Sequence, residues 1–157
     1  MTNPAEKKET TELSENDLKY LIFKIGNELY GAPLLSVREV LECQKPKFMP
    51  NMVSYFSGVI NVRGAIVGVV DLRLKFNSPA NITPRTAMLL CDTERGSVAA
   101  VVDRVECVHQ FIEGDFDRQP MVRSNVSGEY LMGVAKKKEA LRVVEGKKNS
   151  IFRTDFV

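Results

Sequence analysis

The chain has 157 residues, of which 44% are hydrophobic and 27% charged, proportions that are usual for one folded domain of ordinary size. A net charge of +2 is too small to indicate nucleic acid or an anionic membrane as the main partner. The three cysteines are odd in number and show no CxxC spacing, which indicates reduced thiols in the cytoplasm instead of a disulfide framework. We expect Cys91 and Cys107 to be buried, because both lie in apolar runs.

The N-terminal segment is polar and rich in Glu and Thr, without the apolar region of a secretory signal. No stretch approaches the roughly 20 apolar residues of a membrane span. We therefore expect a disordered tail over residues 1–18, a folded domain over 19–150 and a short C-terminal tail over 151–157.

Order is expected to begin with a strand over 20–25, because Leu21, Phe23 and Ile25 alternate with other side chains and share one face. A Gly-Asn turn and a returning strand over 28–32 complete a hairpin.

The next segment begins with a proline, which suits the first position of a short helical turn over 33–36 because it lacks an N–H. Residues 37–42 (VREVLE) predict a strand, and two prolines fix a loop over 45–50. We expect one turn of helix within 51–56. Two apolar runs, 59–62 and 65–70, then flank a Gly-containing turn and predict a second hairpin.

Asp71 is suited to cap a helical turn over 72–76. The polar connection that follows, over 77–85, suggests two subdomains, at about 20–80 and 81–150. The second half contains five further predicted strands, at 86–91, 97–103, 105–112, 130–135 and 140–144, of which the last two are expected to form a hairpin. About ten short strands with hardly any helix predict an all-β sandwich or barrel.

The chain offers little material for catalysis. Its single histidine, His109, lies in an apolar strand, where a partly buried and hydrogen-bonded ring is expected instead of a general base. No GxSxG motif is present, and no GK[ST] follows Gly58, Gly64 or Gly68. One histidine and three dispersed cysteines do not make a zinc site. We therefore expect no catalytic residue, metal or cofactor.

Two strand-like apolar runs each contain a charge, namely Glu39 within VREVL and Arg63 within GVINVRG. They are either the outward-facing residues of half-buried strands or a polar pair at the edge of a protein-binding groove, and the pattern leaves both interpretations open. We predict that Glu39 and Arg63 lie on neighbouring strands, close enough to interact.

These segments together resemble the chemotaxis coupling proteins of the CheW type. The resemblance covers about Tyr20 to Val144, and the order VREV, GVINVRG, VVDLR is its specific part. The matching stretches are Tyr20–Tyr30 (YLIFKIGNELY), Val37–Val40 (VREV), Gly58–Gly64 (GVINVRG), Val69–Arg73 (VVDLR), Val101–Val105 (VVDRV) and Glu129–Gly133 (EYLMG). After Val144 the chain departs from the family, which usually has a longer apolar strand and a helix there.

The resemblance implies two intertwined SH3-like five-stranded β-barrel subdomains with a shared core and few short helices. It implies a non-enzymatic adaptor between the cytoplasmic tips of chemoreceptors and the regulatory domain of the chemotaxis histidine kinase. Such an adaptor is cytoplasmic, is recruited to membrane-bound receptor arrays, and inserts into no membrane itself.

By position, the resemblance places a receptor-binding surface on five residues: Val37, Glu39, Val40, Gly58 and Arg63. We expect the kinase on the exposed hairpins of the first subdomain.

Two other function classes compete with the adaptor. A small β-barrel nucleic-acid-binding module would use the basic clusters at 136–138 and 147–148, but exposed aromatic residues interleaved with that charge are absent. An enzyme would need an unrecognised site around His109 and Cys107.

Overall fold

The computed structural model describes residues 19–111, 116–117, 134–135, 141–144 and 153–156. The predicted tail over 1–18 and both basic clusters lie outside these residues. The strands are β1 (Lys19–Ile25), β2 (Glu28–Pro33), β3 (Val37–Glu42), β4 (Phe56–Val62), β5 (Ala65–Asp71), β6 (Ala87–Thr93), β7 (Gly96–Val102), β8 (Arg104–Gln110), β9 (Phe116–Asp117), β10 (Val134–Ala135), β11 (Leu141–Val144) and β12 (Arg153–Phe156). A 3-10 turn, η2 (Leu34–Ser36), and a one-turn helix, α1 (Leu72–Lys75), complete the described elements.

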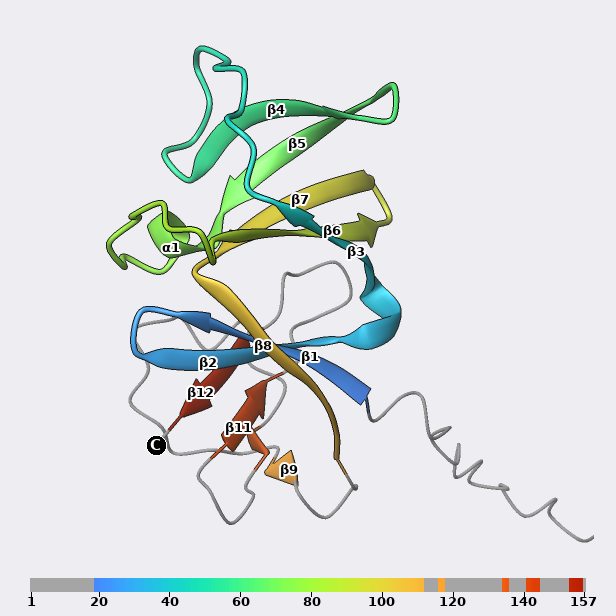
Figure 1. Cartoon of the computed structure of the whole chain (residues 1–157), viewed down its shortest axis with the longest axis vertical. Coiled ribbons are helices and arrows are strands. Elements are labelled where there is room, and N and C mark those ends of the chain that lie inside the picture. The colour runs from blue at the N-terminus through green and yellow to red at the C-terminus, as the bar shows by residue number, and fades with distance from the viewer. Residues whose placement is uncertain (1–18, 112–115, 118–133, 136–140, 145–152, 157) are drawn as a thin grey trace, which may run out of the picture.

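The strands form two main sheets, which lie one above the other in Figure 1. The larger sheet has the order β3-β6-β7-β5-β4, and the smaller has the order β2-β1-β8. Two short pairs, β9 with β10 and β11 with β12, lie on the far side of the smaller sheet. The predicted all-β class is confirmed. Each main sheet takes strands from both sides of residue 80, and the boundary expected there stays a prediction.

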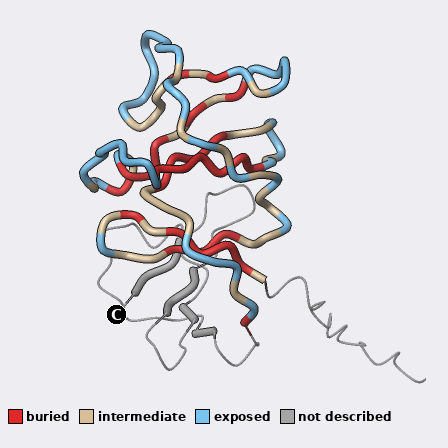
Figure 2. Tube along the Cα trace, in the orientation of Figure 1, coloured by how far each residue is buried: buried red, intermediate tan, exposed pale blue. Residues whose placement is uncertain are grey.

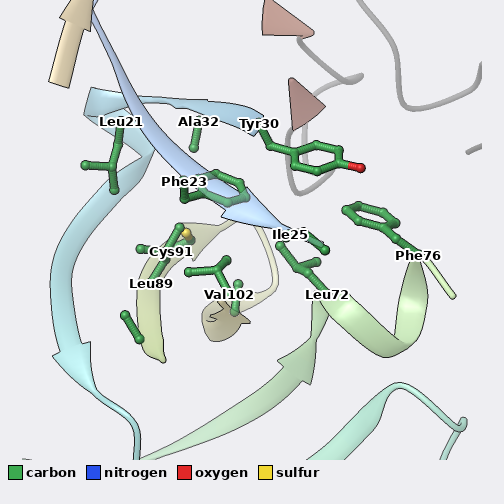
Figure 3. Close-up of a cluster of buried hydrophobic side chains, with 12 residues drawn as sticks. Leu21, Phe23, Ile25, Tyr30, Ala32, Leu72, Phe76, Leu89, Cys91 and Val102 are labelled. Atoms are coloured by element: carbon green, nitrogen blue, oxygen red, sulfur yellow. The ribbon is translucent and has the colours of Figure 1, made fainter. Parts of the chain in front are cut away.

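One hydrophobic core is shared by the two sheets. Leu21, Phe23 and Ile25 from β1 pack together there, as their alternation predicted, against Leu89 and Val102 from the larger sheet (Figure 3). Burying a large apolar side chain stabilises the fold by about 1.5–3 kcal/mol, so this cluster holds one sheet on the other.

The central strands of the larger sheet are buried on both faces, which is why their sequences are nearly continuous apolar runs. In β6, Leu89 faces the shared core, whereas Met88 and Leu90 join a second cluster with Val67 and Val69 of β5. Figure 2 shows these strands as the most continuously buried part of the larger sheet.

Both predicted hairpins in the first half are confirmed, at residues 26–27 and 63–64. Asp71 caps α1, since its carboxylate accepts a hydrogen bond from the Arg73 N–H. The turn expected at 33–36 begins one residue later, at Leu34, because the proline ends β2.

The helical turn expected within 51–56 is wrong. This segment is irregular, with Asn51 in the left-handed region at φ +61°. The Tyr55 carbonyl accepts a hydrogen bond from the Asp71 N–H at 2.8 Å, so pairing with the end of β5 replaces a local helical bond.

The last predicted hairpin is also wrong. In the described residues β10 pairs with β9, and β11 pairs with β12, whose residues were expected to belong to a C-terminal tail. The segment between the two predicted strands, 136–139 (KKKE), contains no Gly, Asn, Asp or Pro, so its turn signal was weak.

Cys91 is buried as expected, but the expectation for Cys107 is wrong, because its side chain is exposed. Cys107 lies on β8, which is the last strand in the order of the smaller sheet, and the pairing of β8 with β1 is irregular next to it. His109 is half-buried and packs edge-on against Phe111, with ring centroids 4.5 Å apart, which confirms the expected partly buried ring.

Candidate protein-binding site on the five-stranded sheet

Glu39 and Arg63 form a bidentate ion pair. Arg63 Nη1 donates to Glu39 Oε1 at 3.1 Å, and Nη2 donates to Oε2. The predicted contact is confirmed, but the predicted placement on neighbouring strands is wrong. Glu39 belongs to β3 and Arg63 directly follows β4, and these strands are the opposite ends of the sheet order. The sheet must therefore curve strongly enough to bring its outer strands together.

The β4–β5 turn explains why Arg63 reaches this position. Arg63 and Gly64 have φ angles of +49° and +87°, the two positive values of a type I′ hairpin turn. The Asn61 side chain supports the turn, because its Oδ1 accepts a hydrogen bond from the Gly64 N–H at 2.8 Å. The Arg63 side chain is accordingly 66% exposed, while that of Glu39 is 34% exposed.

A second arginine lies nearby and is held in the same way. Arg38 of β3 donates through Nε to Asp92 Oδ2 at 3.0 Å and through Nη2 to Oδ1. Ser97 Oγ donates to the same carboxylate at 3.0 Å. Both guanidinium groups are thus oriented before any partner arrives, which lowers the entropy lost on binding.

Between the two arginines the surface is hollowed. The hollow has a volume of about 320 Å³, and Arg38, Arg63 and Ser97 line it together with apolar residues. The apolar residues that line it are Val62, Ala65, Ile66, Val67 and Leu90. Ile66 is 70% exposed, so its side chain is accessible to a partner. Apolar side chains mixed with arginines are typical of protein-binding sites. We call this feature the arginine hollow.

The electrostatics of the ion pair agree with its geometry. The hydrogen bond from Arg63 lowers the pKa of Glu39 below its ordinary value, and the attraction to the Arg63 charge acts in the same direction. Glu39 is therefore ionised at neutral pH. In the residues that the structure describes, no group of three or more His, Cys, Asp or Glu side chains could hold a metal ion.

The other residues expected on the receptor surface have different surroundings. Val37 is half-buried and packs against the shared core. Val40 is 46% exposed, and the alternation of β3 turns it away from Glu39. Gly58 is buried at φ +131°, where a Cβ atom would lie 2.1 Å from the carbonyl oxygen of Lys47. Gly58 thus permits a close backbone crossing, and the hollow itself contains only Arg63 of the five.

Sequence reasoning missed a second exposed apolar feature. All residues from 47 to 54 (KFMPNMVS) are exposed, including Phe48, which is 79% exposed, as well as Met49, Met52 and Val53. We call this segment the apolar loop. Two hydrogen bonds between Lys47 and Val59, of 2.8 and 3.0 Å, hold its base against β4. The sequence did contain a signal for this loop. Its large apolar residues follow neither strand nor helix periodicity, and they lie between and beside two prolines.

The apolar loop and the arginine hollow lie at opposite ends of the larger sheet. In Figure 1 the loop precedes β4 on one side, and the β4–β5 turn that presents Arg63 projects on the other. Figure 2 shows both ends as exposed. The apolar loop and the arginine hollow are therefore separate surfaces of the same sheet.

Comparison with known proteins identifies the family. The CheW-like domain matches residues 19–146. The chain belongs to the CheW-like domain family. It is 31% identical to the chemotaxis protein CheW of Klebsiella aerogenes, over 74% of this chain and 70% of the relative. It is 27% identical to a probable chemotaxis protein CheW of Rhizobium etli, over 78% of this chain and 79% of the relative. Its relatives in this family are thus named as chemotaxis proteins.

The fold comparison agrees. The crystal structure of the scaffolding protein TtCheW from Thermoanaerobacter tengcongensis superposes with a TM-score of 0.74, at 23% identity, covering 83% of this chain and 84% of the other. At that identity the similarity supports the fold. Among the described residues of this CheW-family chain, no helix is long and apolar enough to cross a membrane.

Proposed function

We propose that this CheW-family chain is a non-enzymatic scaffold that couples the cytoplasmic tips of chemoreceptors to the chemotaxis histidine kinase. The observation that carries the proposal is the arginine hollow, which is lined by Arg63, held in place by Glu39, and by the exposed Ile66. The scaffold works in the cytoplasm and is recruited to membrane-bound receptor arrays through its partners.

The receptor tip binds at the arginine hollow. A helical hairpin fits such a surface when apolar side chains on one helix face enter the hollow beside Ile66. The arriving helix removes water from Arg63, which makes this arginine a candidate hot spot. Glu39 keeps the guanidinium oriented while the helix binds.

The regulatory domain of the kinase binds at the apolar loop. Phe48, Met49, Met52 and Val53 form an exposed apolar group, a feature that usually marks a protein-binding surface. The Lys47–Val59 bonds hold the base of the loop, so little backbone order has to be gained on binding. The loop lies within the expected first subdomain, but it joins β3 to β4, which do not pair, and so it differs from the exposed hairpins on which the kinase was expected.

The test is a ternary complex. The purified chain, a receptor-tip fragment and the kinase regulatory domain are mixed pairwise and together, and their masses are measured by analytical ultracentrifugation. We expect two binary complexes and one ternary complex. Competition between the two partners for the chain, or binding of neither, would overturn the proposal.

Single-site variants then separate the surfaces. Phe48→Ser should weaken kinase binding about tenfold or more while receptor binding stays normal, because a large apolar contact is lost at one surface only. Val108→Ser, at another exposed apolar residue on β8, is the matched control and should leave both affinities unchanged. Loss of both partners in Phe48→Ser would contradict the assignment of the loop.

A further inference from the structure

A buried arginine lies where the two main sheets meet. The Arg73 side chain, on α1, is 3% exposed, and its partner Asp71 is 9% exposed. Arg73 Nε donates to Asp71 Oδ1 at 3.0 Å, and Nη2 donates to Oδ2 at 2.9 Å. This bidentate geometry is the strongest form of an arginine–carboxylate contact. The guanidinium is therefore fixed at the end of β5.

The remaining nitrogen of the guanidinium reaches two other segments. Arg73 Nη1 donates to the carbonyl oxygen of Asn81 at 2.5 Å, which ties down the connection between α1 and β6. The same nitrogen lies 3.5 Å from Asp103 Oδ1. Asp103 is the residue at which the chain leaves β7 and enters β8, so it belongs to the passage between the two sheets.

Asp103 carries the connection into the smaller sheet. Its Oδ2 accepts a hydrogen bond of 2.6 Å from the N–H of Gly26, in the turn between β1 and β2. Its own N–H donates to the carbonyl of Lys24 at 3.0 Å. A continuous path of hydrogen bonds and ion pairs thus runs from Asp71 through Arg73 and Asp103 to the β1–β2 turn.

This path adds directional contacts between the two sheets, which the apolar core does not provide. Apolar contacts hold the sheets together, but the hydrophobic effect itself is non-directional. Hydrogen bonds to a planar guanidinium are directional, and leaving any of the buried charges unpaired is costly. Of the described residues that link the sheets, Arg73 combines burial with contacts to three separate segments.

We propose that Arg73 is a positioning residue that, through Asp103, sets the angle between the two main sheets and holds the β1–β2 turn against the larger one. This role goes beyond partner binding and does not depend on which proteins occupy the arginine hollow or the apolar loop. It makes the two sheets one rigid body, so that both binding surfaces keep a constant orientation relative to the smaller sheet.

Asp103→Ala tests the proposal, because it removes the acceptor of the Gly26 N–H and leaves the Arg73–Asp71 pair intact, so the chain should still fold. By NMR, we expect the Gly26 amide to exchange with solvent about tenfold faster, the effect of losing one hydrogen bond. Residual dipolar couplings of β1, β2 and β8 should no longer fit the orientation defined by the couplings of the larger sheet. Arg73→Lys, which keeps the charge but cannot bridge both carboxylates, should shift the same couplings.

Two controls separate positioning from general stability. Asp92→Ala removes a carboxylate that also pairs with an arginine, but at an exposed site. Val69→Ala destabilises the interior of the larger sheet without touching the path. Both should keep wild-type dipolar couplings and Gly26 exchange. Wild-type couplings in Asp103→Ala and Arg73→Lys, or equal changes in Val69→Ala, would overturn the proposal.

Discussion

Glu39 and Arg63 are joined by two hydrogen bonds although their strands stand at opposite ends of the order β3-β6-β7-β5-β4. The pair spans the two outer strands of a curved sheet and stands beside the arginine hollow. Arg63 therefore has two functions under our proposal. It pairs with Glu39 in the free protein, and it contacts the receptor helix in the complex.

Replacing Arg63 should affect binding and leave the fold intact. We expect Arg63→Ala to weaken binding of a receptor-tip fragment about thirtyfold, because a desolvated arginine at the rim of an apolar contact is a typical hot spot. Kinase binding should stay near normal. Titration calorimetry measures both affinities, and circular dichroism checks folding.

The matched control is Arg104→Ala, which removes another ion-paired arginine, on β8 of the smaller sheet. It should change neither affinity. A folded Arg63→Ala variant with unaltered receptor affinity would exclude the hollow as the receptor site. Val37→Asp is a poorer probe, since Val37 packs against the shared core and a charge there would also destabilise the fold.

Two glycines in the same hairpin region should respond very differently to alanine. Gly58→Ala is expected to lower the free energy of unfolding by about 3 kcal/mol, because the new Cβ would meet the Lys47 backbone. In Gly64→Ala the new Cβ would meet open space. The free energy of unfolding should therefore fall by only about 1 kcal/mol, which is the strain of a positive φ. Urea denaturation measures both. If both variants lost the same free energy of unfolding, the Lys47 backbone would not lie close to Gly58.

The ionisation of Glu39 should depend on Arg63. The folded-state pKa of Glu39 is lowered from 4.5, so the ion pair is fully formed above that value and is lost as the pH falls through the lowered pKa. In Arg63→Gln the pKa of Glu39 should rise towards its ordinary value, and in Arg104→Gln it should not change. Carboxyl-carbon NMR titration gives each midpoint, and the same midpoint in wild type and Arg63→Gln would show that the pair does not form in solution.

The three cysteines should differ in reactivity. Burial raises the pKa of Cys91 from 9.0 to about 12, which lowers its thiolate fraction at neutral pH about a thousandfold. Cys107 is exposed and should react first with a thiol reagent, whereas Cys43 is half-buried and its pKa is raised by burial. Mass spectrometry after brief labelling identifies the order, and labelling of Cys91 as fast as Cys107 would contradict the buried position of β6.

Local patterns predicted the local structure well. Alternation located β1, two turn dipeptides located the first two hairpins, and an aspartate marked the start of α1. The contact between Glu39 and Arg63 was also predictable, because both charges interrupt apolar strands.

Properties that depend on which strands become neighbours could not be predicted from such patterns. The parallel pairing of β5 with β7 joins segments that no turn connects, and β11 pairs with a later strand instead of an earlier one. The exposure of Cys107 follows from the outer position of β8, which the residues beside it in the sequence do not reveal. The role of Gly58 depends on a loop that crosses over it.

The order of the strands also has a consequence for how the chain folds during synthesis. The larger sheet uses residues 37–102, one continuous stretch, whereas β1 and β2 are made earlier and β8 later. The first hairpin therefore leaves the ribosome long before Gln110, which pairs with Lys19, has been added. Pairings so distant in sequence form slowly. We expect the larger sheet to fold first and the first hairpin to wait with one edge open, a period in which it is most vulnerable to aggregation.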